Sequence, residues 1–326
     1  MVVLYIWGQN MKKSEIFKFA VDKTAKIGKF ILVMLFIFGL ALFSGCKKEN
    51  SSKKKFVVSC YPVYIMALNL ADGVDDVEIL KMSETHSGCL HDFQLQSEDL
   101  KRIEKSSLFI INGAGMESFI DKVVKELPNV KIIDSSNGIE LIKDEDCDHD
   151  HDEVYEHEYN PHIWLSVDNY IKQIENIEIG LSKMDSTNSD KYHENAGKYI
   201  EKLNNLKNEM HSRLDSISGR NIITFHEAFP YFAKEFGLNI AAVVNSQPGS
   251  GPSAKEISEV TEKIKKYKIK ALFTEPQYSD SSAKIISSET GAKVYTLDPV
   301  VTGNGDKDDY INKMRKNMEV LEEALK

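Results

Sequence analysis

Cysteine is scarce in this chain: 326 residues contain only four. So few cysteines cannot build the dense disulfide framework that holds many small secreted domains together. The chain must instead bury an ordinary hydrophobic core. Its 42% hydrophobic residues suffice for one large core or two smaller ones.

A long membrane-spanning run is also missing. The apolar stretch FILVMLFIFGLALF at residues 30–43 falls short of the roughly 18 to 20 residues that cross a bilayer as a helix. Six lysines and two acidic residues precede it at residues 12–29, and Ser44 and Gly45 follow it. This is the layout of a secretory signal. We expect the signal to cover residues 1–45, with Met11 as the natural start.

The sequence LFSGC at the end of this signal resembles the bacterial lipobox, whose cysteine is lipidated. The resemblance implies that Cys46 carries a lipid anchor to the outer face of the cell membrane. Residues 46–55, polar and lysine-rich, are expected to be a flexible tether. The remaining cysteines form an odd set whose pairing is open: Cys60, Cys89 and Cys147.

Positive charge is in deficit. The chain has 41 basic and 50 acidic residues, and removing residues 1–45 leaves 35 against 48, a net charge of about −13. A surface of that charge repels nucleic acid, so we exclude nucleic-acid partners.

Short strand-like runs alternate with helical patterns in each half of the chain. The expected strands are residues 56–59, 77–82, 108–112 and 130–134, then 221–224, 240–244, 270–274 and 293–297. Such alternation predicts parallel sheets covered by helices. We therefore expect two similar α/β lobes, at residues 56–186 and 219–326.

Proline is absent between the lobes. Residues 189–218 contain no proline and one glycine, and apolar residues recur there in steps of three and four. This pattern predicts one long amphipathic helix. We expect residues 187–218 to form a connecting helix that joins the lobes and resists wide hinge opening.

Three histidines and one aspartate lie where strands end. His226 and Asp298 closely follow expected strands of the second lobe, and His91 and His162 lie in loops of the first. Ligands of open α/β sheets bind at the carboxyl ends of strands, so a cleft between the lobes would bring the four side chains together. Three imidazoles and a carboxylate suit Zn²⁺, although sequence alone leaves open a water in the fourth position, as in a zinc hydrolase.

Four segments resemble the solute-binding lipoproteins of zinc ABC transporters, the ZnuA-like and AdcA-like proteins. They are HDFQLQSEDLKRIEKSSLFIINGAGMESFI at 91–120, NPHIWLS at 160–166, HEAFPYFAKEFGL at 226–238 and EPQYSDSSAKIISSETGAKVYTLDPV at 275–300. The resemblance implies two (βα)4 Rossmann-like lobes, a rigid joining helix and one metal between the lobes. It further implies a monomeric zinc receptor, not an enzyme, that delivers Zn(II) to an ABC transporter permease.

Carried over by motif, His91, His162 and His226 match the metal ligands, and Asp298 matches a position where relatives often place a fourth. Glu275 ends a strand and is expected to accept a hydrogen bond from a ligand histidine. Manganese-binding relatives have Glu where this chain has His226, which favours zinc over the alternative of manganese or iron.

A histidine-rich acidic loop precedes NPH. Residues 147–158 carry His149, His151 and His157 among carboxylates, with little apolar surface to bury. Two interpretations stay open: accessory capture of zinc, or a solvated loop.

Overall fold

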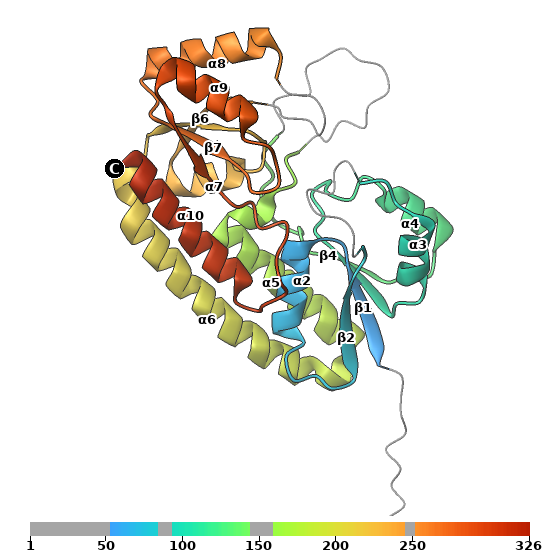
Figure 1. Ribbon diagram of the computed structural model, residues 1–326. Coiled ribbons are helices and arrows are strands. Elements are labelled where there is room, and N and C mark those ends of the chain that lie inside the picture. The colour runs from blue at the N-terminus through green and yellow to red at the C-terminus, as the bar shows by residue number, and fades with distance from the viewer. Residues whose placement is uncertain (1–52, 84–92, 144–158, 245–251) are drawn as a thin grey trace, which may run out of the picture. The chain divides into compact units, whose positions relative to one another are not determined.

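Short strands alternate with helices in both halves of the molecule (Figure 1). The computed structural model describes residues 53–83, 93–143, 159–244 and 252–326. The N-terminal lobe contains strands β1 (Lys54–Val58), β2 (Val77–Lys81), β3 (Leu108–Ile111) and β4 (Ile132–Asp134), with helices α2 (Tyr61–Leu70), α3 (Ser97–Glu104) and α4 (Ile120–Glu126).

The C-terminal lobe repeats this pattern. It contains strands β5 (Asn221–Thr224), β6 (Asn239–Val243), β7 (Ala271–Thr274) and β8 (Lys293–Thr296), with helices α7 (Pro230–Phe236), α8 (Ala254–Tyr267), α9 (Ser281–Thr290) and α10 (Asp309–Leu325). All eight strands overlap the runs expected from sequence.

Each lobe has one four-stranded sheet. The strand orders are β2-β1-β3-β4 and β6-β5-β7-β8, and every neighbouring pair is parallel. Central strands β3 and β7 are buried along their whole length, which explains the apolar runs LFII in β3 and ALF in β7. The predicted fold class, two parallel α/β lobes, is confirmed.

Two long helices lie between the lobes in sequence. A 3-10 turn (Ile163–Leu165) leads into α5 (Val167–Met184), and a second (Ser186–Asn188) leads into α6 (Ser189–Leu214). At 1.5 Å per residue, the 26 residues of α6 make a rod about 39 Å long. The regular helix ends before Ser218, because residues Asp215–Ile217 tighten into a 3-10 turn.

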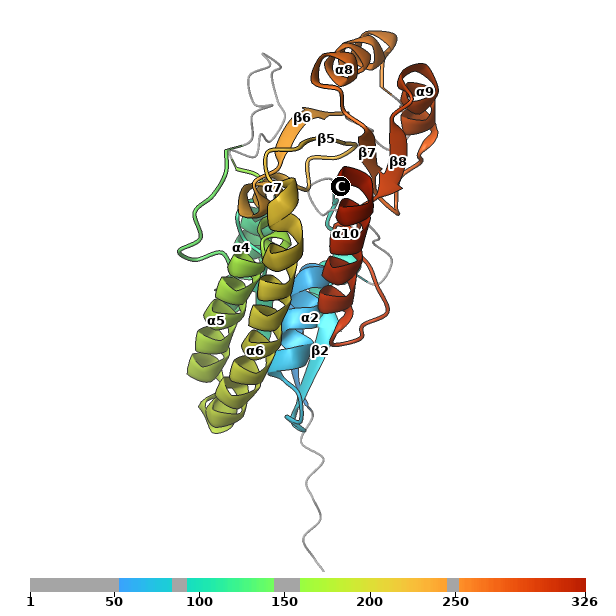
Figure 2. The same ribbon diagram turned by 90° about the vertical axis from the view of Figure 1, so that its left-hand side faces the viewer.

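Helix α6 packs on both lobes. It contacts α5 and α2 and also α10 of the C-terminal lobe, and in Figure 2 it runs between α5 on one side and α2 and α10 on the other. Its buried side chains recur in steps of three and four: Tyr192, Asn195, Ala196, Tyr199, Leu203, Leu206, Met210 and Leu214. One hydrophobic core runs through them, from Leu108 of β3 to Phe273 of β7. Because the two sheets share this core, opening them as rigid bodies would expose apolar surface.

Other local signals agree with the sequence. Helix α8 begins with a capping box in which Ser253 Oγ accepts from Glu256 N at 3.2 Å and Glu256 Oε2 accepts from Ser253 N at 2.7 Å. Among the described residues, no helix combines the length and hydropathy that crossing a membrane requires.

Candidate metal centre

His162 lies in the loop that leads into α5, and its side chain is buried, with 1% exposure. Its ring Nδ1 lies 3.1 Å from Asn160 Oδ1, and its backbone N–H donates to the same oxygen. The Asn160 amide is oriented by its own Nδ2, which donates to the carbonyl of Glu227 at 2.7 Å. Because an amide oxygen only accepts, the His162 proton sits on Nδ1, and Nε2 keeps a lone pair for a metal.

His226 follows β5 by two residues and has an acidic partner. Its Nδ1 lies 3.0 Å from Oε1 of Glu275, which is 2% exposed and directly follows β7. Gln277 Nε2 donates to the other carboxylate oxygen at 2.7 Å and holds it in place. The carboxylate accepts from Nδ1, so the Nε2 atom of His226 is also directed away from its protein partner. The prediction that Glu275 supports a histidine agrees with this geometry.

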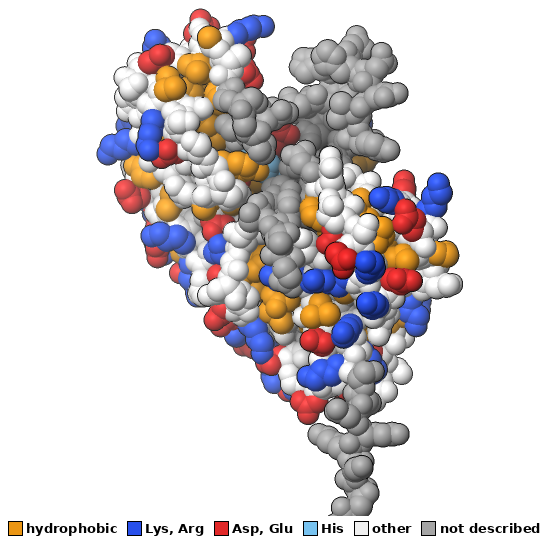
Figure 3. Space-filling model, turned by 45° about the vertical axis from the view of Figure 1, so that its right-hand side comes forward, with side chains coloured by type: hydrophobic (Ala, Val, Ile, Leu, Met, Phe, Trp, Pro, Cys, Tyr) orange, Lys and Arg blue, Asp and Glu red, His pale blue; other side chains and the backbone are white. Residues whose placement is uncertain are grey.

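The two imidazole rings are in edge-to-face contact. Their ring centroids are 5.0 Å apart with planes at 88°, and the Trp164 ring lies 5.2 Å from His162. In the space-filling view, a histidine surface is visible within the hollowed part of the molecule (Figure 3). Histidine side chains from different lobes thus lie near enough to share a cation that prefers imidazole nitrogen.

The loop that carries His162 is fastened from both lobes. From the N-terminal lobe, Asn112 Nδ2 donates to the Pro161 carbonyl at 3.0 Å. From the C-terminal lobe, Tyr231 Oη donates to the Asn160 carbonyl at 2.8 Å. Asn112 and Asn160 were not recognised in the sequence, although the NPH motif places Asn160 two residues before the histidine.

Behind Asn112 lies a buried carboxylate. Glu117, 3% exposed, accepts from the backbone N–H of Asn112 at 2.8 Å and of Gly113 at 3.0 Å. Burial raises the pKa of the Glu117 carboxyl to about 7, and a hydrogen bond from Ser59 partly opposes this rise. Glu117 thus anchors the turn after β3, on which Asn112 reaches the His162 loop.

Asp298 has other partners in the structure. Its Oδ1 accepts from the N–H of Val300 at 2.7 Å, and its Oδ2 pairs with the Lys313 ammonium of α10. Val300 has φ of 60°, a left-handed conformation that costs a β-branched residue energy, and the Asp298 hydrogen bond supports this turn. Ligation of a metal by Asp298 would require Oδ2 to leave Lys313.

Several predicted residues lie outside the described part of the chain. These are the proposed ligand His91, the lipidation residue Cys46, the cysteines Cys89 and Cys147, and the loop histidines His149, His151 and His157. Within the described ranges, no group of three or more His, Cys, Asp or Glu side chains is placed to hold a metal ion. Of the predicted set, the structure places His226 in ring contact with His162 and in hydrogen-bond contact with Glu275.

Two α/β lobes that share one core, with a histidine from each lobe in ring contact, suit a binding protein that takes a metal between its lobes. Residues 56–324 match the family described as zinc-uptake complex component A, periplasmic, and the chain belongs to this ZnuA family. The resemblance inferred from the four sequence segments is confirmed. The family consists of components of uptake complexes and is not an enzyme family.

Individual relatives agree. The chain is 32% identical over 289 residues to zinc-binding protein AdcA of Streptococcus pyogenes serotype M3, covering 82% of this chain and 55% of AdcA. It therefore spans about half the length of that relative. It is 27% identical over 312 residues to the high-affinity zinc uptake system protein ZnuA of Bacillus subtilis, covering 91% of this chain and 97% of the relative.

Solved structures show the same fold. The Zn(II)-bound ZnuA-like domain of Streptococcus pneumoniae AdcA is 28% identical with a TM-score of 0.71, covering 84% of this chain and 99% of that one. The Pseudomonas aeruginosa binding protein FpvC, in complex with Ni²⁺, is 25% identical with a TM-score of 0.71, covering 84% and 97%.

Proposed function

We propose that this protein is an extracytoplasmic receptor that captures Zn(II) and passes it to the membrane permease of an ABC transporter. The metal ligands in this proposal are His91, His162 and His226, with Asp298 as the fourth. Zn(II) is the cargo and is bound reversibly. The relatives named for zinc binding and zinc uptake support this choice of cargo.

One observation carries the proposal: His162 and His226, the two proposed ligands within the described residues, hold their Nδ1 proton against an oxygen acceptor. Asn160 and Glu275 accept from the two Nδ1 atoms, so in each neutral ring the lone pair that can bind zinc lies on Nε2. Neutral imidazole suits zinc, whereas manganese prefers carboxylate oxygen. A manganese or iron receptor would be better served by an acid in place of His226.

In the proposed ligand set, Asp298 would exchange its lysine partner for zinc. In the structure its Oδ2 is paired with Lys313, and a zinc ion would compete with that ammonium for the carboxylate. A divalent ion outcompetes a single ammonium when three imidazoles already hold it nearby. Binding would then release Lys313.

The same proposal covers the cellular setting. Residues 1–45 would be removed as a signal, Cys46 would carry a lipid, and the monomer would work at the outer face of the membrane. His149, His151 and His157 would capture zinc weakly ahead of the main site. The core shared by both lobes favours loading and release by local loop movement.

Competitive titration tests this function. The mature protein has one tryptophan, Trp164, whose ring lies 5.2 Å from that of His162, so its fluorescence reports metal binding directly. We expect one tight zinc, with manganese and iron displaced by it. Replacing His226 by Ala should weaken zinc binding by roughly 100-fold, about a quarter of the binding free energy of a four-ligand zinc site.

His211→Ala is the matched control, because this histidine lies on α6 and contacts Asp215 at the surface. It should bind zinc as the unmodified protein does. Equal zinc affinity in the His226 variant would refute the proposed site. Zinc-limited growth of cells lacking the receptor should be restored by the unmodified gene and not by the His226 variant.

A further inference from the structure

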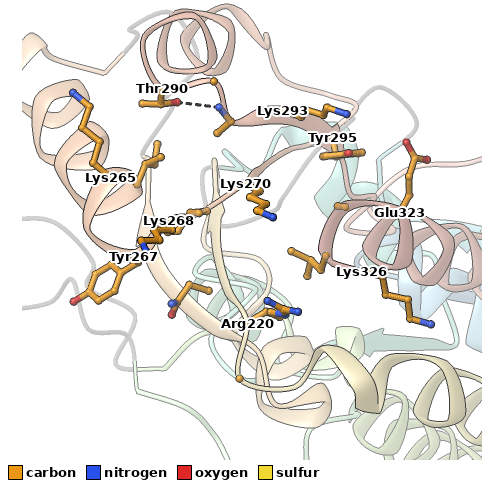
Figure 4. A pocket seen from close by; sticks show the side chains of 18 residues that line it. Arg220, Lys265, Tyr267, Lys268, Lys270, Thr290, Lys293, Tyr295, Glu323 and Lys326 are labelled. Atoms are coloured by element: carbon orange, nitrogen blue, oxygen red, sulfur yellow. Dashed lines mark hydrogen bonds between the residues drawn. The ribbon is translucent and has the colours of Figure 1, made fainter.

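An open cavity of about 760 Å³ lies at the opposite edge of the C-terminal sheet from His226 and Glu275 (Figure 4). Its wall includes the amino ends of β5, β7 and β8 and the last residues of α8, α9 and α10. The loops that carry His226 and Glu275 leave the carboxyl ends of β5 and β7. Parallel strands of four residues separate these edges by about 13 Å, so the cavity is distinct from the metal centre.

Basic side chains dominate this cavity. One acidic residue, Glu323, lines it against six basic ones: Arg220, Lys265, Lys268, Lys270, Lys293 and Lys326. Lys326 is paired with Glu322 at 2.7 Å. Within the described ranges, the other five basic side chains form no ion pair with a carboxylate. In a chain with a net charge of −9, such a cluster does not follow from composition.

The ends of three helices neutralise only part of this positive charge. Helices α8, α9 and α10 end at the cavity, and each helix C-terminus carries about half a negative charge. Lysines near such ends stabilise the helices, which is the simplest reason for their presence. Three helix ends, Glu323 and the terminal carboxylate of Lys326 offset between three and four of these five cations, so between one and two positive charges remain.

Two of the cations lie across the middle of the cavity. In Figure 4 the side chains of Arg220 and Lys270 extend toward the centre, whereas Lys265 and Lys293 lie at the rim. Arg220 and Lys270 directly precede the neighbouring strands β5 and β7. The positive charges of Arg220 and Lys270 repel each other, and an anion bound between them would attract both. The planar guanidinium matches phosphate oxygens in two-pronged hydrogen bonds.

We propose that this cavity binds a soluble ligand carrying two or more phosphate groups. Its volume is in the range of small-molecule sites and far exceeds one phosphate ion. The apolar lining residues Ile264, Ile269 and Leu325 are buried, so the cavity has no exposed aliphatic side chains to insert into a bilayer. This feature favours a phosphate chain over a lipid surface. Tyr267, 46% exposed, adds an aromatic face at the rim.

Titration calorimetry of the metal-free protein with tripolyphosphate tests this proposal. The test variant is Arg220→Ala with Lys270→Ala. We expect it to lose at least about tenfold in affinity, because two charge-assisted contacts are removed. Binding by the unmodified protein should also weaken steeply as salt rises.

The matched control removes two cations elsewhere. Lys122→Ala with Lys125→Ala changes net charge equally on α4 of the other lobe, where both side chains are exposed. This control should bind tripolyphosphate within about twofold of the unmodified protein. Zinc titration of all three proteins should be unchanged, which separates this proposal from the zinc function and verifies folding.

Three results would overturn the proposal: no binding of tripolyphosphate, equal loss in both double variants, or binding only to vesicles of phosphatidylglycerol. The last result would assign the cations to a lipid surface.

Discussion

The rings of His162 and His226 lie 5.0 Å apart at nearly a right angle, although 64 positions and the whole of α5 and α6 separate them in sequence. Asn160 orients one ring and Glu275 the other. Neither acceptor is a proposed ligand, yet both decide which nitrogen each histidine presents. The geometry of capture therefore depends on hydrogen bonds behind the ligands.

Glu275→Gln should weaken zinc binding by about tenfold, because it removes the charge that makes His226 a stronger donor and weakens control of its tautomer. Competitive zinc titration measures this loss. Glu262→Gln, a change of the same kind on the exposed surface of α8, is the control and should have no effect. Unchanged affinity in the Glu275 variant would mean that His226 is not a ligand.

Lys313→Met should strengthen zinc binding by up to about tenfold. The substitution frees Oδ2 of Asp298, so zinc no longer has to displace an ammonium to gain its fourth ligand. Lys316→Met on the same helix removes only a surface pair with Glu319 and serves as control. A lower melting temperature with unchanged zinc affinity would leave Asp298 as a support of the Val300 turn alone.

Glu117 should make the metal-free protein less stable as pH rises. Its folded pKa of about 7 exceeds the ordinary value of 4.5, so the folded state binds more protons between these two values. The contribution of Glu117 to stability is therefore fully present below pH 4.5 and is lost, by up to about 3 kcal/mol, as pH rises through 7.

Glu117→Gln, which cannot ionise, isolates this contribution. Urea unfolding at pH 5 and pH 8 gives the difference in unfolding free energy between the two proteins. Relative to the unmodified protein, the variant should be more stable at pH 8 than at pH 5 by up to about 3 kcal/mol. The same difference at both pH values would show that the Glu117 carboxyl does not titrate in this window.

Deletion of residues 147–158 should leave one tight zinc with unchanged affinity. The proposed accessory histidines His149, His151 and His157 bind weakly and are not among the proposed ligands of the main site. Equilibrium dialysis should show fewer weakly bound zinc ions in the deletion variant. Loss of the tight zinc would instead place a ligand within the loop.

Much of the fold follows from local patterns. The strand NIIT is observed at the predicted residues, and the capping box at Ser253 begins a helix at Ala254. The apolar residues that recur in steps of three and four from Tyr192 to Leu214 are all buried along α6. Such features depend on neighbours within a few positions, and sequence displays them directly.

Features that depend on long-range contacts were not predictable in this way. Asn112, Asn160 and Tyr231 carry no special signature, because their importance comes from partners 49 to 71 positions away. The pairing of Asp298 with Lys313 is similar: the LDP motif marks the position without showing what occupies the carboxylate. A charged pair forms only when helix α10 is packed beside the strand end.

The sequence by itself determined the class of this protein. The spacing of its apolar residues, its helix-capping residues and the order of its four motifs can all be read without knowing the fold. Tertiary structure alone decided how the site works. It set the tautomers of His162 and His226 and paired Asp298 with Lys313. It also gathered, at the far edge of one sheet, five cations that have no carboxylate partner among the described residues. The physical reason is that hydrogen bonds and charges act through distances in space, which only the packed chain defines.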